Sequence, residues 1–388
     1  MAKLGDVFNL QMGKTPARAN LAYWTDGTNE WVSIADLSSY EKYVEGTKEK
    51  ITDLAVQESG IKKISANTVI MSFKLSLGKT AITKTPVYTN EAIMAFLPSG
   101  KYDVCPDYFF YLFSGKDWSE GTNRAVMGAT LNKATLRNIE IDVPPLDEQR
   151  RIAAILDKVT DLINKRRAQL DKLDLLVKSR FVEMFGDPVL NPMNWPSVPL
   201  SDMADIVSGV TKGRKTKEHD LIEVPYMAVS NVKDGYIDWK TVKTIAATQS
   251  EIDQYRLLPD DVLMTEGGDP DKLGRGAIIK TPLENCIHQN HVFRVRLNET
   301  KILPVYFAEY LQHQKAKRYF LRCAKQTTGI ASINMTQLKG LPTIVPSTEL
   351  QISFNKEIEQ VNNAKVATEQ SLSRLEILKK TLMQQYFG

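Results

Sequence analysis

The stretch LDKLDLLVKSRFVEMFG at residues 170–186 recurs as LSRLEILKKTLMQQYFG at residues 372–388, at an offset of 202 residues and without a gap. Both copies end in Phe-Gly, and leucines recur at matching positions. Extended backwards, the same offset pairs Leu136 with Leu338 and Gln149 with Gln351. Chance does not account for such a match, so we interpret the chain as an internal duplication.

The repeated segment is predicted to form a long helix in each copy. Strand-like stretches that contain proline precede it at residues 139–145 and 341–346, and acidic residues at its start suit the positive end of a helix. Its apolar positions follow a spacing near 3.5 residues, which is typical of a coiled-coil seam. The expected seam consists of Leu156, Val159, Ile163, Leu170, Leu173 and Val177 in the first helix and Ile358, Val361, Leu372, Leu375 and Leu382 in the second.

Two helices related by duplication would pair most simply about a pseudo-two-fold axis, and hence antiparallel. A helix of about 38 residues is about 57 Å long at 1.5 Å per residue. The alternative is a pair of ordinary amphipathic helices, each docked on a globular core. The periodicity favours the coiled coil and leaves this alternative open.

The segments between the helices also correspond, although loosely. Residues 31–37 resemble residues 226–232, and residues 68–71 match residues 261–264. Both segments are rich in short strand-like runs and turns. We therefore predict an α+β protein in which two mixed α/β domains, related by internal duplication, are joined by two long helices that form an antiparallel coiled coil. The expected boundaries are 1–146 for the first domain, 147–187 for the central helix and linker, 188–348 for the second domain and 349–388 for the C-terminal helix.

The composition is that of a folded protein, with 43% hydrophobic and 25% charged residues. The N-terminus lacks the apolar segment of a secretory signal, and no run reaches the roughly 18 apolar residues of a membrane span, which predicts a cytoplasmic protein with no membrane partner. Cys105, Cys286 and Cys323 are scattered and fit reduced thiols better than disulfides. The net charge of +4 permits a nucleic-acid partner without requiring one.

No motif for catalysis stands out. The glycine-rich segment 267–276 has neither the Walker lysine nor the dinucleotide spacing, so loop geometry or close approach to a DNA backbone explains it better. His288 and His291, with Cys286 nearby, lack evident further ligands for a metal, and structural histidines are the plainer interpretation. No residues are placed for nucleophilic or acid/base chemistry. We therefore expect a binding role, with no catalytic residue, cofactor or metal in this chain.

Basic and polar residues gather in loops at matching places of the two domains. Lysine and arginine supply phosphate contacts, and amide and imidazole groups can read base edges. For any one of these residues, the alternative is that it is an ordinary solvated loop residue. The candidate DNA contacts are Lys14, Arg18, Asn20, Lys74, Lys79 and Arg124 in the first domain, and Lys212, Arg214, Lys215, Lys217, Lys272, Arg275, His288, Asn290, Arg322, Lys325 and Gln326 in the second.

Three short motifs stand near the opening and at the end of the first domain: GKTP at residues 13–16, WVSIADL at residues 31–37 and IDVPPLDEQRRI at residues 141–152. The first two resemble the opening of a target-recognition domain, and the third resembles the boundary signature, in the specificity subunits of type I restriction-modification enzymes. The second copy departs from this pattern, with STELQ at residues 347–351 and no Thr-Pro step after Gly209. The order of domain, helix, domain and helix over the whole chain is more specific than any one motif.

The resemblance implies a subunit that binds double-stranded DNA and assembles with two modification (methyltransferase) subunits and with restriction (ATPase/endonuclease) subunits. Each target-recognition domain would read one half of a split, asymmetric site, and the helices would set the spacing and dock the modification subunits. DNA methylation at adenine N6 with S-adenosylmethionine, and cleavage in host defence with ATP and Mg, would take place on the partner chains.

Two other classes of protein stay open from the residues alone. One is a self-contained DNA methyltransferase or nuclease with a degenerate site, which would bind S-adenosylmethionine without a partner. The other is a coiled-coil adaptor with no DNA role. Salt-dependent DNA binding by the complex would separate the leading interpretation from the adaptor, because phosphate contacts make affinity fall with salt.

Overall fold

The computed structural model describes residues 1–388 except 75, 119–122, 126–127, 215–219, 270–272 and 328–329, and it describes the backbone alone at 123–125, 128–130, 326, 327 and 330. The chain forms two compact units, Met1–Arg167 with Gln370–Gly388 and Ala168–Glu369. The breaks after Arg167 and after Glu369 are 202 residues apart, which is the offset of the sequence repeat. Each unit holds one domain and part of each long helix.

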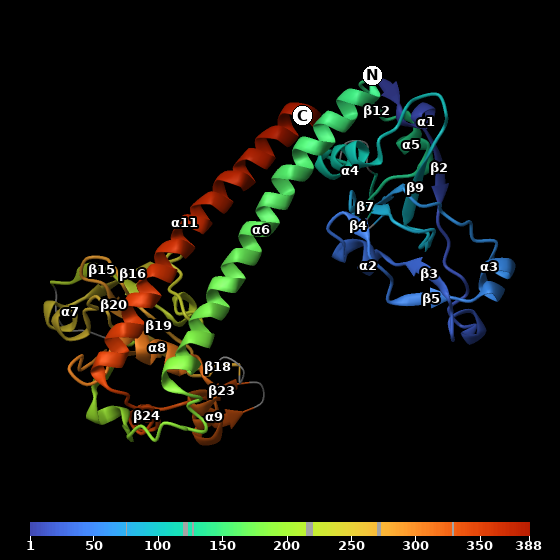
Figure 1. Cartoon of the computed structure of the whole chain (residues 1–388). Coiled ribbons are helices and arrows are strands. Elements are labelled where there is room, and N and C mark those ends of the chain that lie inside the picture. The colour runs from blue at the N-terminus through green and yellow to red at the C-terminus, as the bar shows by residue number, and fades with distance from the viewer. Residues whose placement is uncertain (75, 119–122, 126–127, 215–219, 270–272, 328–329) are drawn as a thin grey trace. The chain divides into compact units, whose positions relative to one another are not determined.

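The first domain combines short helices with a five-stranded sheet, a three-stranded sheet and two strand pairs, β1-β12 and β10-β11 (Figure 1). Its elements are β1(Ala2–Lys3), α1(Leu4–Val7), β2(Phe8–Met12), η1(Leu21–Tyr23), β3(Asn29–Val32), α2(Ile34–Ser39), β4(Tyr43–Val44), β5(Glu49–Ile51), α3(Asp53–Ser59), β6(Val69–Ser72), β7(Thr80–Thr83), β8(Tyr88–Thr89), β9(Ile93–Pro98), α4(Pro106–Gly115), β10(Asn123–Ala125), β11(Gly128–Thr130), α5(Lys133–Asn138) and β12(Glu140–Ile141). The main sheet has the order β2-β9-β6-β7-β4, and the second sheet has the order β5-β3-β8. Strand β1 pairs with β12, which brings the two ends of the domain together.

The second domain repeats this plan. Its elements are β13(Ser197–Pro199), η2(Leu200–Asp202), β14(Ala204–Ser208), β15(Ile222–Met227), η3(Val229–Asn231), β16(Lys243–Ala247), α7(Gln249–Tyr255), β17(Val262–Thr265), β18(Gly267–Gly268), β19(Gly276–Ile278), β20(Ile287–His288), β21(Val292–Leu297), α8(Pro304–Gln312), α9(Gln314–Cys323), β22(Lys325–Thr327), β23(Ile330–Ser332), α10(Met335–Lys339) and β24(Pro342–Ile344). Its main sheet has the order β14-β21-β17-β19, its second sheet has the order β16-β15-β20, and β13 pairs with β24.

The two main sheets share four strands in the same order, whereas β4 has no counterpart among the described strands of the second main sheet. Strands β2, β9, β6 and β7 of the first main sheet match β14, β21, β17 and β19 of the second, with the same antiparallel neighbours. Each second sheet contains one parallel pair, β3 with β8 and β15 with β20. The predicted duplication and the mixed α/β character of both domains are confirmed.

The cores consist of aromatic and aliphatic side chains from the main sheet, one domain helix and one face of a long helix. In the first core, the rings of Phe8 and Phe109 meet edge to face with centroids 4.8 Å apart, and Leu156 packs against the same cluster. In the second, Phe181 stacks on Tyr306 at 5.3 Å. Burial of such large apolar groups stabilises each domain and also fixes it to its helix.

The long helices are α6(Leu146–Phe185) and α11(Thr348–Phe387), of 40 residues each. Both start directly after a Pro-containing segment and carry acidic residues in the first turn, Asp147 and Glu148 in α6 and Glu349 in α11. The predicted helix starts therefore agree with the structure within a residue.

The helices run antiparallel within each unit. In the second unit Lys365 of α11 pairs with Asp174 of α6 at 2.6 Å and Glu357 pairs with Arg180 at 2.6 Å, so the numbers rise in one helix as they fall in the other. In the first unit Arg167 pairs with Glu376 at 2.8 Å. The prediction of antiparallel pairing is confirmed.

The expected seam residues divide into two groups by burial. The buried members are Leu156, Val159, Ile163, Val177 and Ile358. The half-buried members are Leu170, Leu173, Val361, Leu372, Leu375 and Leu382. Leu156, Val177 and Ile358 also belong to a domain core. The apolar stripe therefore contributes both to helix pairing and to packing of the domains on the helices. In the described part of the chain, no helix combines the length and apolarity that crossing a bilayer requires.

Candidate nucleic-acid interface

The loop after β2 joins the two sheets of the first domain. The Gly13 N–H donates to the Ile93 carbonyl at 3.1 Å, and the Lys14 N–H donates to the Thr89 carbonyl at 2.9 Å. A Cβ at Gly13 would lie 2.3 Å from the carbonyl oxygens of Thr89 and Asn90, so only glycine fits. The Trp31 indole N–H donates to the Lys14 carbonyl at 3.1 Å. The Gly-Lys pair of the opening motif thus has a structural role.

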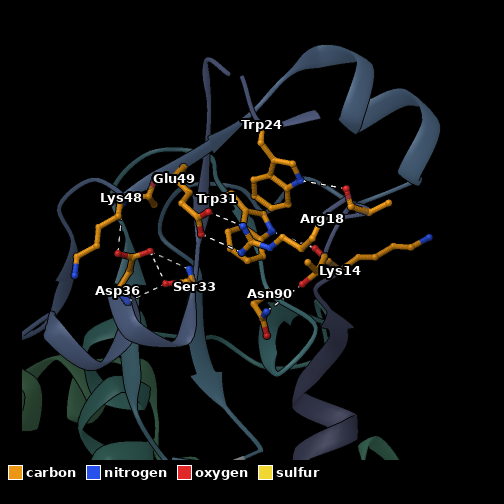
Figure 2. A network of polar contacts seen from close by, with 12 residues as sticks. Lys14, Arg18, Trp24, Trp31, Ser33, Asp36, Lys48, Glu49 and Asn90 are labelled. Atoms are coloured by element: carbon orange, nitrogen blue, oxygen red, sulfur yellow. Dashed lines mark hydrogen bonds and ion pairs between the residues drawn. The ribbon is translucent and has the colours of Figure 1, made fainter. Parts of the chain in front are cut away.

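Arg18 lies on an aromatic platform and is already neutralised. Its guanidinium carbon is 3.9 Å from the centroid of Trp24 and 4.9 Å from that of Trp31. It binds both carboxylate oxygens of Glu49, with one N···O distance of 3.0 Å, and the hydrogen bond raises the pKa of Arg18 (Figure 2). Cation–π and bidentate contacts hold the side chain in place. Arg18 therefore links the loop after β2 to β5 through its ion pair with Glu49.

A buried carboxylate near the same loop caps the N-terminus of α2. Asp36 is 2% exposed, and its carboxylate accepts from the Ser33 N–H at 3.1 Å and from the Ser33 hydroxyl at 2.7 Å (Figure 2). In the second domain Asn231 has the matching position and accepts from the Ala228 N–H at 3.0 Å. The motif at residues 31–37 thus caps α2 in the first domain, and its counterpart caps η3.

The second domain repeats the neutralised arginine. Arg214 binds both carboxylate oxygens of Glu251 and donates to the Ala246 carbonyl at 3.1 Å. This contact lowers the pKa of Glu251. Gly209 repeats the close approach of Gly13, because a Cβ there would lie 1.9 Å from the His288 carbonyl oxygen. The departures in the second opening motif therefore leave its glycine junction and its arginine pair in place.

His288 is fully buried and does not face solvent. Its Nδ1 lies 2.7 Å from the Val292 carbonyl oxygen, and burial lowers the pKa of the imidazole to about 4, so the ring is neutral. Its neighbour Asn290 is half-buried and contacts His291, which pairs with Glu266. We remove His288 from the candidate DNA contacts, because a neutral ring inside the domain has no route to base edges.

The possible metal site around His288 and His291 finds no support in the described residues, where no three His, Cys, Asp or Glu side chains are grouped to hold an ion. Cys286 is buried, and burial raises the pKa of its thiol to about 12. A thiol that stays protonated is a poor metal ligand and a poor nucleophile.

The remaining candidates differ in exposure. Lys74 is half-buried beside the Phe73 ring, and Arg275 is half-buried. Lys215, Lys217 and Lys272 lie outside the described residues, as do the side chains of Arg124 and Gln326. The exposed candidates are Lys14, Asn20, Lys79, Lys212, Arg322 and Lys325.

The structure also reveals basic residues that the sequence analysis did not single out. Lys315 and Arg318 lie on α9 with the exposed Arg322, and these three side chains line a hollow of about 470 Å³ with Val189 and Leu321. Their spacing of three and four residues on a helix was the available signal. The predicted contacts of the second domain lie mostly in loops, whereas these residues lie on a helix.

Comparison with known proteins adds an independent finding. The chain matches the type I restriction modification DNA specificity domain twice, at residues 1–172 and 192–377. It is similar to the MjaIX specificity subunit of Methanocaldococcus jannaschii, with 27% identity over 252 residues that cover 60% of this chain and 58% of that protein. It is also similar to the StySPI specificity subunit of Salmonella potsdam, with 24% identity over 328 residues, 79% of this chain and 69% of that protein. The chain thus spans less than two thirds of the length of the first relative.

Solved structures of the same fold cover the whole chain. The S subunit of a type I restriction-modification system from M. genitalium has a TM-score of 0.58 at 13% identity, covering 100% of this chain and 95% of that one. A chain from work on complex assembly and conformational transition of the type I restriction-modification system has a TM-score of 0.62 at 18% identity, covering 100% and 96%. At these identities the likeness shows the fold alone.

Proposed function

Because this chain belongs to the type I restriction-modification DNA specificity family, we propose that it binds a bipartite, asymmetric DNA site and directs partner subunits to it. The strongest support for this proposal is the internal duplication. The two domains share the order of four strands in their main sheets while their loops differ, and α9 of the second has no counterpart among the described residues of the first. Two readers imply two half-sites, and their divergence implies that the half-sites differ.

We assign one target-recognition domain to residues 1–146 and the other to residues 188–348, with the central helix and linker at 147–187 and the C-terminal helix at 349–388. Contacts with DNA fall to the exposed basic and amide candidates Lys14, Asn20, Lys79, Lys212, Arg322 and Lys325. Lysine and arginine position the duplex through its phosphates, and the amides are suited to base edges.

The long helices act as the spacer in this proposal. Helix α6 has 40 residues, which corresponds to about 60 Å at 1.5 Å per residue, or the rise of roughly 18 base pairs. A spacer of that order suits readers that enter successive major grooves, which recur about every 10 base pairs. The charged, half-exposed surfaces of both helices are the sites where two modification subunits would dock.

The chemistry belongs to partner chains. The described residues offer a buried, protonated Cys286 thiol and a neutral, enclosed His288, which are unsuited to nucleophilic work. We therefore assign adenine N6 methylation with S-adenosylmethionine to modification subunits, and ATP- and Mg-dependent cleavage to restriction subunits, within the cytoplasm.

Mapping methylated adenines across the genome, in a strain with this gene and in one without it, tests the proposal. We expect one split motif with two different halves to be methylated only when the gene is present. The family role would be refuted by an unchanged methylation pattern. Binding of S-adenosylmethionine to the purified chain alone, measured by calorimetry, would instead support a self-contained methyltransferase.

A further inference from the structure

Helix α9 separates its charge from its apolar side chains. The segment Gln314–Cys323 reads QKAKRYFLRC and contains no acidic residue. Lys315, Arg318 and Arg322 follow each other at three and four residues, which places them on one face. Ala316 and Phe320 are buried on the opposite face. The helix therefore presents a row of cations to solvent.

The buried face fixes α9 firmly to the second domain. Gly274 has a φ of +69°, and a Cβ there would lie 2.2 Å from the Phe320 ring, so the glycine allows the ring to pack closely. The Tyr319 hydroxyl donates to the Gln337 carbonyl at 2.9 Å. The Phe320 contact explains why residue 274 is glycine, and both contacts hold the basic face in a defined position.

The described part of the chain places no counter-charge beside the cations on this face. Within the described residues, no carboxylate lies at ion-pair distance from Lys315, Arg318 or Arg322, and Lys317, which points elsewhere, pairs with Asp234 at 3.7 Å. Arg318 and Arg322 are exposed, and Lys325 is exposed at the start of β22. Arg214 in the same domain shows the contrast, because its charge is neutralised by Glu251. The α9 face is a local positive surface on a chain of net charge only +4.

Among the described residues of the first domain, no helix corresponds to α9. Residues 116–122 join α4 to β10, whereas residues 313–324 join α8 to β22 and contain the ten residues of α9. Seven residues are too few to hold a helix of that length with its connections. The basic face therefore distinguishes the second domain from the first.

We propose that α9 binds the phosphate backbone of DNA and that it does so at the second half-site only. This inference rests on the proposed DNA-binding function and adds where and how the duplex is held. Two arginines and a lysine around a hollow of about 470 Å³ match phosphate oxygens, since guanidinium groups bind them through paired hydrogen bonds. Such contacts strengthen binding without reading sequence.

The test uses the complex reconstituted with its modification subunits and a duplex that carries the site found by methylation mapping. The triple variant K315Q/R318Q/R322Q removes the three charges. Because each phosphate contact contributes about 0.9 to the slope of log K against log salt, we expect the slope in KCl to become shallower by about 2 to 3. The methylated sequence should stay the same.

Two further variants serve as controls. R318K/R322K keeps the charges and should retain most of the wild-type slope, which separates loss of charge from damage to the helix. K101Q/K133Q/K339Q removes the same net charge from exposed lysines elsewhere and should leave the slope within about 0.5 of wild type, less than one phosphate contact.

An unchanged slope in the triple variant would overturn the inference. Impaired assembly with the modification subunits, together with a normal slope in whatever complex forms, would also overturn it and would identify α9 as a protein-binding surface. If the wild-type complex fails to bind its mapped site at all, the proposed DNA-binding function is refuted first, and the two failures are thereby distinguished.

Discussion

Gln149 and Gln351, 202 residues apart, make the same set of hydrogen bonds in the two units. Gln149 is fully buried near the start of α6. Its side-chain oxygen accepts from the Cys105 N–H at 2.9 Å, and its amide nitrogen donates to the carbonyls of Asp103 at 2.9 Å and Pro144 at 2.8 Å. One side chain thus connects the loop before α4 to the start of the long helix.

Gln351 repeats this arrangement near the start of α11. Its side-chain oxygen accepts from the Leu303 N–H at 2.8 Å, and its amide nitrogen donates to the carbonyls of Lys301 at 3.3 Å and Pro346 at 2.9 Å. The identity found at this position in the repeat therefore reflects a buried polar joint between domain and helix. A buried amide satisfied on both sides specifies one docking geometry.

Replacing either glutamine with leucine should destabilise its unit. Gln149→Leu leaves the Cys105 N–H and the Pro144 carbonyl, both in half-buried residues, without their side-chain partner, and each unsatisfied group costs roughly 1–3 kcal/mol. We expect a loss of about 3 kcal/mol in the free energy of unfolding, measured by urea denaturation. Gln360→Leu on the exposed face of α11 is the matched control and should change stability by less than about 0.5 kcal/mol. Equal effects at both positions would contradict the assigned role.

Arg18 should contribute to stability more than to DNA recognition. Arg18→Ala removes a partly exposed ion pair and a cation–π contact, for an expected loss of about 1 kcal/mol. The exposed Lys79 offers the contrast. Lys79→Ala should weaken DNA binding and leave thermal stability unchanged. A changed methylation motif in Arg18→Ala would show that this arginine reads bases.

Glu309 should make the second unit less stable as pH rises. Burial raises the pKa of its carboxyl from 4.5 to about 7, although Lys365 and Lys178 oppose the shift. A carboxyl whose folded pKa lies above its unfolded value binds more protons in the folded state, so stability is lost as pH rises from about 4.5 through 7.

Glu309→Gln removes the ionisable group, so its advantage over wild type should grow as pH rises through that window and be complete above pH 7. We expect a gain of about 2 kcal/mol at pH 8 and almost none at pH 4, below the unfolded pKa, from urea unfolding at each pH. Glu299→Gln, at an exposed position, should follow the wild-type pH profile. A Glu309→Gln gain that is the same at both pH values would rule out titration of this carboxyl as the cause.

Lengthening both helices should lengthen the spacer between the half-sites. Four residues inserted after Lys172 and four after Arg374, which are equivalent in the repeat, add about 6 Å to each helix, or roughly 2 base pairs. Methylation mapping should then show the same two half-sites further apart. Insertion into one helix alone should disturb ion pairs such as that between Asp174 and Lys365. Methylation by the complex should then be lost. An unchanged spacer in the double insertion would exclude the helices as the spacer.

The helices could be predicted because their signal is local and repeated. Leu156 and Val177 show the seam spacing within one continuous segment, and the second copy shows the same phase at an offset of 202 residues. Burial of one helix face requires this periodicity whatever the helix packs against. The sequence could not show that Leu156 and Val177 would belong to two different domain cores.

The candidate DNA contacts were less predictable because the role of a cation depends on its neighbours. Arg18 and Glu49 are 31 residues apart, and Arg214 and Glu251 are 37 apart, so only folding brings each carboxylate to its arginine. His288 was predicted as a DNA contact because of its polar neighbours in the sequence, but the folded domain buries it completely. In contrast, the half-buried Lys315 and the exposed Arg318 lie on a helix for which no DNA contact was predicted, and no described carboxylate lies at ion-pair distance from either.

The sequence by itself determined the duplication, the two long helices and their antiparallel pairing, because these follow from periodic burial and from symmetry between contiguous copies. The tertiary structure alone decided which charges are neutralised and which face outward. The fold brings Glu49 within ion-pair distance of Arg18, whereas it leaves Arg322 exposed. Electrostatic interactions depend on distance in space and on burial rather than on separation along the chain, and both are set only when the strands and helices have packed.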